Sequence, residues 1–338
     1  MKLWRKLLWP FVPFYYLGAL FIKKMYDWGI YSSKSYDFPI ITVGNLSVGG
    51  TGKSPFVIYL VDLLLPQKKI AALSRGYGRT TKGFSFVAEN QTAQEVGDEP
   101  LQLKKKFPKI TVAVDADRKN GIEKLQREVD PEVIILDDAF QHRKVSAGLQ
   151  ILLTPFYKLY TDDFLLPAGD LREPKSGANR ADIIVVTKCP STISGEAKKV
   201  IMQKLKPKAH QKIYFTSIKY AKKVFSKFET LTLDQFLEQE FCLVTGIANP
   251  KPLVDFLKEK RAKFNHKNFP DHHHFTKKEI EIISKAPVIL TTEKDFMRLE
   301  KEESLQKKLF YLPIEMEFLS QQKSFDDCIL NFANTKKR

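Results

Sequence analysis

The stretch Ile40-Ile-Thr-Val-Gly-Asn-Leu-Ser-Val-Gly-Gly-Thr-Gly-Lys-Ser54 joins a short apolar run to a glycine-rich turn, and a helix-like segment follows. A bound phosphate needs backbone N–H donors on a tight loop at a helix amino terminus, a lysine that reaches the β and γ oxygens, and a hydroxyl for Mg²⁺. The residues that supply these groups are Gly49, Gly50, Thr51, Gly52, Lys53 and Ser54. The stretch therefore predicts an ATP-binding phosphate loop.

This loop departs from the usual pattern G-x-x-x-x-G-K-[ST], because Ser47 stands where the first glycine belongs. We expect Gly49 and Gly50 to shape the turn instead. Substitution of either glycine by alanine should then weaken nucleotide binding more than Ser47→Ala does.

Outward from the loop, six short apolar runs alternate with amphipathic stretches of helix length. Continuous apolar runs are typical of parallel strands buried on both faces, and the stretches between them are long enough for crossover helices. The runs cover residues 40–43, 70–73, 110–114, 133–136, 149–153 and 183–186. The sequence thus predicts an α/β fold with a parallel sheet like that of P-loop nucleotide hydrolases.

The chain is long enough for more than one domain, since its 338 residues are 43% hydrophobic and single cores stop growing near ~250 residues. A second α/β set begins after residue 236. A linking hairpin is expected from the strand-like runs 213–218 and 223–225. The predicted parts are an amino-terminal helix in 1–30, a P-loop kinase core in 31–210, a two-stranded linker in 211–235 and a smaller α/β domain in 236–338.

The amino terminus is apolar and aromatic between basic flanks. Residues 7–22 would span only ~24 Å as a helix, short of a ~30 Å hydrocarbon core. Lys23 and Lys24 follow where a secretory signal would need a cleavage site of small residues. A helix anchored at the membrane surface fits best, and a helix buried against the protein's own core is the alternative.

The chain is strongly basic, with 55 Lys and Arg against 39 Asp and Glu and a net charge of +16. Such a charge favours an anionic partner: nucleic acid, an acidic membrane or a phosphorylated substrate. The lysines are scattered rather than gathered in one aromatic-interleaved stripe, so we expect no nucleic acid. Cys189, Cys242 and Cys328 lie far apart, which indicates reduced thiols in the cytosol and no metal site.

Paired carboxylates follow one of the predicted strands. Asp137 and Asp138 end the run Val133–Leu136. An acidic side chain at this edge of a parallel sheet can hold Mg²⁺ beside a phosphate loop. The alternative is a solvated turn.

A kinase must also activate a hydroxyl group. The candidates are Asp98 and the cluster Asp271-His-His-His274, whose adjacent histidines rarely converge on one ion. A histidine that supports a carboxylate base and an exposed histidine-rich turn both remain open. The charged loop with Arg172, Glu173 and Lys175 can clamp phosphates or be solvated.

Together these segments closely resemble the tetraacyldisaccharide 4′-kinase family. Eight ordered motifs between residues 38 and 299 carry the resemblance. They are Val43–Pro55, Leu73–Gly78, Gly97–Pro100, Asp137–Arg143, Leu166–Pro174, Gly246–Pro250, Asp271-His272 and Thr291–Asp295. Two residues differ from the family's usual pattern: Ser54 replaces a threonine, and Asp170 stands where a small residue or proline is common.

The resemblance implies transfer of the ATP γ-phosphate to the 4′-hydroxyl of an acylated glucosamine disaccharide 1-phosphate. The product is lipid IVA, made at the cytoplasmic face of the inner membrane by a peripheral or monotopic protein with no obligate protein partner. The implied catalytic residues are Asp98, which accepts the hydroxyl proton, its partner His272, and Lys53. The implied metal ligands are Ser54, Asp137 and Asp138, and Gln141, Arg172 and Glu173 complete the nucleotide site.

Two rival functions are kept. One is a membrane-associated P-loop ATPase or GTPase, for which Thr187-Lys188 faintly resembles a guanine-recognition loop, although Cys189-Pro190 follow where an acidic residue is required. The other is a basic nucleic-acid-binding module. Because Asp98 and His272 fall in different predicted domains, the kinase reading also predicts domain closure.

Overall fold

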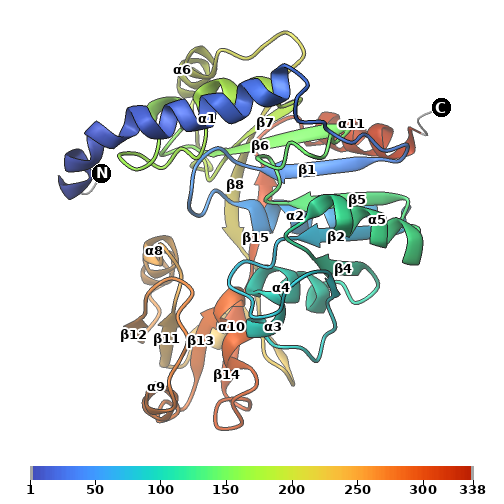
Figure 1. Cartoon of the computed structure of the whole chain (residues 1–338). Helices are drawn as coiled ribbons and strands as arrows, with labels where there is room; N and C mark the ends of the chain where they lie inside the picture. Colours follow the sequence, from blue (N-terminus) through green and yellow to red (C-terminus); the bar gives the residue numbers. More distant parts are fainter. Residues whose placement is uncertain (1–2, 336–338) are drawn as a thin grey trace.

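The computed structural model describes residues 3–335 and contains two sheets flanked by helices (Figure 1). The large sheet has nine strands in the order β15-β8-β7-β6-β1-β5-β2-β4-β3, and the small sheet has six in the order β10-β9-β14-β13-β11-β12. In Figure 1 the small sheet lies below and to the left of the large one. The predicted α/β fold with a parallel sheet is confirmed.

The large sheet is parallel except at its edges, where β3 and β15 run antiparallel to their neighbours. All six predicted apolar runs fall on its strands. The strands are β1 Ile40–Gly44, β2 Ile70–Ser74, β3 Ser85–Phe86, β4 Thr111–Val114, β5 Val133–Asp137, β6 Leu149–Pro155, β7 Ile183–Thr187, β8 Lys212–Tyr220 and β15 Ile314–Phe318.

Helices cover both faces of this sheet. Successive residues of a strand point to opposite faces, so each apolar strand presents side chains to the helices on both sides. Ile41 of β1 packs in the core beneath α2 and α11, whereas Ile40 packs in the core beneath α5. Phe56 of α2 and Phe325 of α11 meet with ring centroids 5.8 Å apart. The helices are α2 Lys53–Leu64, α3 Ala93–Val96, α4 Asp98–Lys106, α5 Arg118–Glu128, α6 Gly195–Leu205 and α11 Gln322–Asn334.

The small sheet is parallel along β12, β11, β13 and β14. Its helix α10 packs against α4 of the large part, so one continuous apolar core runs from Leu101 of α4 to Phe296 of α10. Its elements are β9 Lys223–Phe225, β10 Thr230–Thr232, α7 Leu233–Leu237, β11 Phe241–Thr245, α8 Lys251–Glu259, β12 Phe264–Asn268, α9 Lys277–Ile283, β13 Ile289–Thr292, α10 Glu293–Leu299 and β14 Leu309–Leu312.

The structure differs from the expected division in two places. The runs 213–218 and 223–225 do not pair as a hairpin: β8 pairs with β7 and β15, and β9 pairs with β10 and β14. Segment 314–334, expected in the small domain, returns to the large sheet as β15 and α11. The apolar face of α11, with Phe325 and Ile329 fully buried, explains this return, because it covers the core beside α2.

The amino-terminal segment forms a 3₁₀ helix, η1 Leu3–Phe11, followed by α1 Val12–Asp27. No described residue of α1 is fully buried, although the helix contacts the rest of the protein through Tyr15, whose hydroxyl donates to the Arg172 carbonyl. Tyr15 and Ala19 on one side are half-buried, whereas Phe14, Leu17 and Phe21 on the other are 59–74% exposed. Within residues 3–335, no helix has both the length and the apolar character needed to span a membrane.

Candidate active site

The phosphate loop joins the carboxyl end of β1 to the amino terminus of α2. Gly49 and Gly52 adopt left-handed backbone conformations, with φ angles of 103° and 91°, which glycine alone adopts readily. Gly50 does not, and a Cβ there would meet only the Lys188 Nζ at 3.7 Å. The expectation that Gly50 shapes the turn is therefore wrong, and Gly52, just before Lys53, shares that role with Gly49.

A neighbouring strand end holds this loop in place. Thr187, the last residue of β7, donates from its hydroxyl to the carbonyl of Thr51 at 2.7 Å. Lys188 donates to the carbonyl of Gly50, also at 2.7 Å. The two residues that resemble a guanine-recognition motif thus support the phosphate loop, a role that sequence reasoning missed because β6, β7 and β1 are separated in the chain.

Lys53 lies at the centre of a polar cluster. Its Nζ is 3.4 Å from an Asp138 carboxylate oxygen and 3.2 Å from the Asn45 side-chain oxygen. Arg172 pairs with the same aspartate at 3.2 Å. Burial raises the pKa of Asp138, but the Lys53 and Arg172 charges outweigh it, and the pKa is lowered. The structure thus brings Lys53, Asp138 and Arg172 together beside the loop.

Asp137 has different surroundings from those of its neighbour. Its Oδ1 is buried and accepts no hydrogen bond from the described residues. Burial, and then the Asp138 charge, raises the pKa of Asp137 to about 6. Asp137, Ser54 and Glu99 line one pocket.

Arg118 contacts the backbone of this carboxylate pair. Only 2% exposed, it donates to the backbone carbonyl of Asp137 at 3.2 Å. Burial lowers its pKa to about 10. A buried arginine fixes this strand end, and no motif in the sequence marks it.

Gln141 and Glu173 close the other side of the loop. The Gln141 amide donates to the carbonyl of Asn45 at 2.8 Å and to the Glu173 carboxylate at 2.9 Å. Arg180 pairs with Glu173 at 2.9 Å. These residues reach the start of the phosphate loop from two separate segments.

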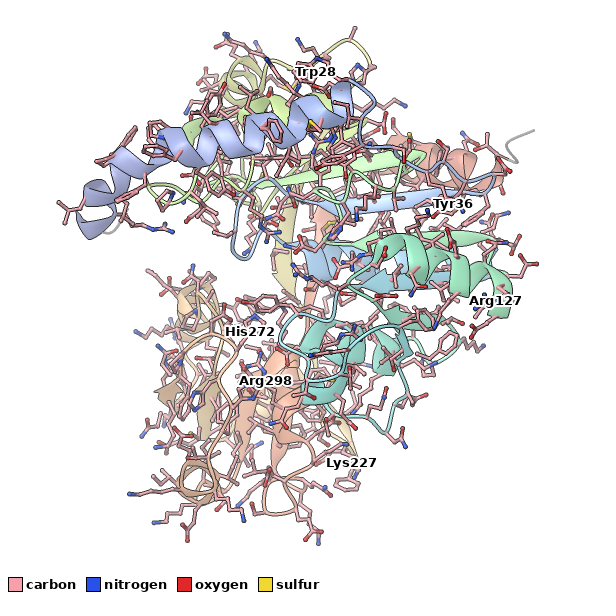
Figure 2. The ribbon with its side chains drawn as sticks, in the orientation of Figure 1. Trp28, Tyr36, Arg127, Lys227, His272 and Arg298 are labelled. Carbon is pink, nitrogen blue, oxygen red and sulfur yellow. The ribbon has the colours of Figure 1, made fainter. Side chains whose placement is uncertain are left out.

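The contacts of Asp98 join the two parts of the protein. His272 Nδ1 lies 2.8 Å from an Asp98 carboxylate oxygen, and Arg298 donates through two nitrogens to both oxygens. Figure 2 shows His272 and Arg298 side by side, facing α4. Burial raises the pKa of Asp98, but the His272 and Arg298 hydrogen bonds outweigh it and hold the pKa at about 2. The same hydrogen bond raises the pKa of His272.

The rest of the histidine cluster diverges. His273 bonds to Glu279 of α9 at 3.0 Å, whereas His272 turns to Asp98. Arg298 also pairs with Asp295 at 3.0 Å, and Lys294 pairs with Glu99 at 2.5 Å. Sequence reasoning missed Arg298, because it lies 200 residues from Asp98 in the chain.

Comparison with known proteins shows the family of this chain. The sequence model of the Tetraacyldisaccharide-1-P 4′-kinase family matches residues 4–334. The chain belongs to this family. The tetraacyldisaccharide 4′-kinase of Flavobacterium johnsoniae is 47% identical over 336 residues and that of Flavobacterium psychrophilum 44% identical over 341, with at least 98% of each chain covered.

A solved structure of the family has the same fold. The "apo" form of LpxK from Aquifex aeolicus in complex with ATP is 32% identical, with a TM-score of 0.79 over 98% of this chain and 99% of the other. The resemblance inferred from the eight motifs is confirmed, and this protein is an ATP-dependent lipid kinase of lipid A biosynthesis.

Proposed function

We propose that this protein transfers the ATP γ-phosphate to the 4′-hydroxyl of tetraacyldisaccharide 1-phosphate between the phosphate loop and the Asp98–His272 pair. One observation carries the proposal: Ser54 of the phosphate loop, Asp137 and Glu99 line the same small pocket, and Glu99 adjoins Asp98, which bonds to His272. Donor and acceptor groups would meet there in line, as phosphoryl transfer requires.

The phosphate loop would hold the ATP phosphates through its backbone N–H groups and the charge of Lys53. The proposed ATP-contacting residues are Gly49, Gly50, Thr51, Gly52, Lys53 and Ser54, with Gln141, Arg172 and Glu173 supporting them. Asp138 would keep Lys53 and Arg172 directed at the phosphates, since its oxygens pair with both.

The residues present fit a Mg²⁺ ion. Asp137 offers a buried oxygen without a hydrogen-bond donor, and the Ser54 hydroxyl lines the same pocket. Mg²⁺ in kinases is held by one or two such oxygens together with phosphate oxygens. We assign Ser54 and Asp137 as the residues that would hold it, with Asp138 as a further oxygen donor beside them. The ion, when bound, would neutralise charge on the transferring phosphate.

The 4′-hydroxyl would be oriented by Asp98. A carboxylate with a pKa of about 2 stays ionised and accepts the hydroxyl hydrogen bond, but it holds a proton poorly. His272, bonded to it at 2.8 Å, has a pKa raised from its ordinary value, and in its neutral form it would accept the proton that the hydroxyl releases as the O–P bond forms. This pair already joins the two parts of the protein, so no closure is needed to form it, and domain closure stays a prediction.

The membrane surface is the proposed meeting place with the lipid substrate. The outer face of α1 exposes Phe14, Leu17 and Phe21, and the chain carries a net charge of +16. Apolar side chains beside basic ones favour insertion among anionic headgroups. We therefore propose a peripheral or monotopic enzyme at the cytoplasmic face of the inner membrane.

The test is to incubate the full chain in detergent with γ-labelled ATP, Mg²⁺ and tetraacyldisaccharide 1-phosphate. Wild-type protein and the variant Lys199→Ala, at an exposed lysine of α6, should label the lipid, whereas Lys53→Ala and Asp98→Asn should not. Hydrolysis of ATP at the same rate with and without the lipid would instead favour the ATPase rival.

A further inference from the structure

Residues 170–172, here called the strap, lie between the amino-terminal helix and the phosphate loop. On the inner side the strap pairs with the loop: Val48 N–H donates to the Asp170 carbonyl, and Arg172 N–H donates to the Leu46 carbonyl, both at 2.8 Å. Ser47 and Leu171 form an antiparallel bridge between these two bonds. The first half of the phosphate loop, residues 46–48, is therefore extended. Among the described residues, the strap is the only segment that pairs with it in this antiparallel way.

On the outer side, the amino-terminal segment bonds to both ends of the strap. The Tyr15 hydroxyl of α1 donates to the Arg172 carbonyl at 2.8 Å. Arg5 of η1 pairs with the Asp170 carboxylate, which Lys158 also contacts.

The strap also carries a side chain of the nucleotide site. Arg172 pairs with Asp138, which pairs in turn with Lys53. A hydrogen bond at the Arg172 carbonyl limits rotation of the backbone from which its guanidinium extends. Burial raises the pKa of Tyr15, so its hydroxyl remains a hydrogen-bond donor at neutral pH.

We propose that Tyr15 is a positioning residue for ATP binding: through the strap, it fixes Arg172 and the first half of the phosphate loop. The amino-terminal helix is thereby a structural part of the nucleotide site as well as the proposed membrane contact. This inference rests on the nucleotide site proposed above.

Tyr16 provides a matched control, because it follows directly in α1, is 41% exposed and loses the same hydroxyl in Tyr16→Phe. ATP binding to the full chain in detergent would be measured by calorimetric titration for wild type, Tyr15→Phe, Tyr16→Phe and Lys53→Ala. A neutral hydrogen bond contributes about 1 kcal/mol, so Tyr15→Phe should weaken ATP binding by about two- to fivefold and Tyr16→Phe should leave it unchanged.

Steady-state kinetics separate an effect on the position of Arg172 and the phosphate loop from an overall loss of stability. Tyr15→Phe should raise the KM for ATP by a similar factor, while the KM for the lipid, the thermal midpoint and partition onto vesicles of anionic phospholipid stay at wild-type values. Equal ATP affinity in both tyrosine variants, or a parallel rise in both KM values, would overturn the inference. Wild-type ATP affinity in Lys53→Ala would instead show that the nucleotide site itself is misassigned.

Discussion

Asp137→Asn should stabilise the nucleotide-free protein while abolishing its Mg²⁺-dependent turnover. The pKa of Asp137 is raised from 3.8 to about 6, and each unit corresponds to about 1.4 kcal/mol, so the ionised carboxylate destabilises the fold by at most about 3 kcal/mol. Because Asp137 as a whole is only partly buried, solvent screens part of this effect. We expect Asp137→Asn to raise the free energy of unfolding by about 1–2 kcal/mol. Substitution of an active-site residue whose charge destabilises the fold commonly increases stability at the expense of activity.

The adjacent Asp138→Asn is the matched control, with the opposite sign. Asp138 pairs with Lys53 and Arg172, and its pKa is lowered, so loss of its charge removes a favourable interaction. Partly exposed pairs of this kind contribute up to about 1 kcal/mol each, so this variant should be destabilised. Neighbouring carboxylates of the same type would then respond in opposite directions.

Thermal melts in EDTA at pH 7.5 and pH 5.0 provide the assay. A raised pKa means that the folded protein binds the Asp137 proton more tightly than the unfolded chain does. The destabilisation of the fold by ionised Asp137 is therefore complete above pH ~6 and declines toward pH ~4. The advantage of Asp137→Asn should therefore shrink by roughly half at pH 5.0. A lower midpoint for Asp137→Asn than for wild type at pH 7.5, or an advantage independent of pH, would refute the reasoning.

Three further predictions follow from the site. Arg298→Met leaves the buried Asp98 carboxylate without its guanidinium partner, so thermal melts should show a loss of about 3–5 kcal/mol of stability and assays a loss of most of the turnover. The control Arg127→Met, at an exposed arginine, should match wild type in both measurements. If neutral His272 takes up the proton, the turnover rate at saturating Mg²⁺ should rise through a pKa above 6.5, and His272→Asn should remove that acid limb from the pH profile. Gly49→Ala should weaken ATP binding several-fold in a titration, and Gly50→Ala and Ser47→Ala should change it little, because only Gly49 among the three has a left-handed backbone; equal losses would contradict this.

The sequence predicted the strands of the large sheet well and their partners less well. Apolar runs such as 133–136 identify buried strands, because a strand covered on both faces has no polar side. They do not specify which edge accepts another strand, so the sequence assigned 314–334 to the small domain, whereas β15 completes the edge beside β8. Pairing across the sheet is a long-range property of the folded chain.

By itself, the sequence determined the family and predicted the residues of the site. The phosphate loop, the aspartate pair and the eight ordered motifs each consist of residues close together in the sequence. They can therefore be identified without knowing how the chain folds. The tertiary structure alone decided which partner each charged group has: Arg298 for Asp98, Lys53 and Arg172 for Asp138, and no donor among the described residues for the Asp137 Oδ1. A pKa depends on burial and on charges within a few ångströms, so two adjacent aspartates acquire opposite shifts only once the chain has folded.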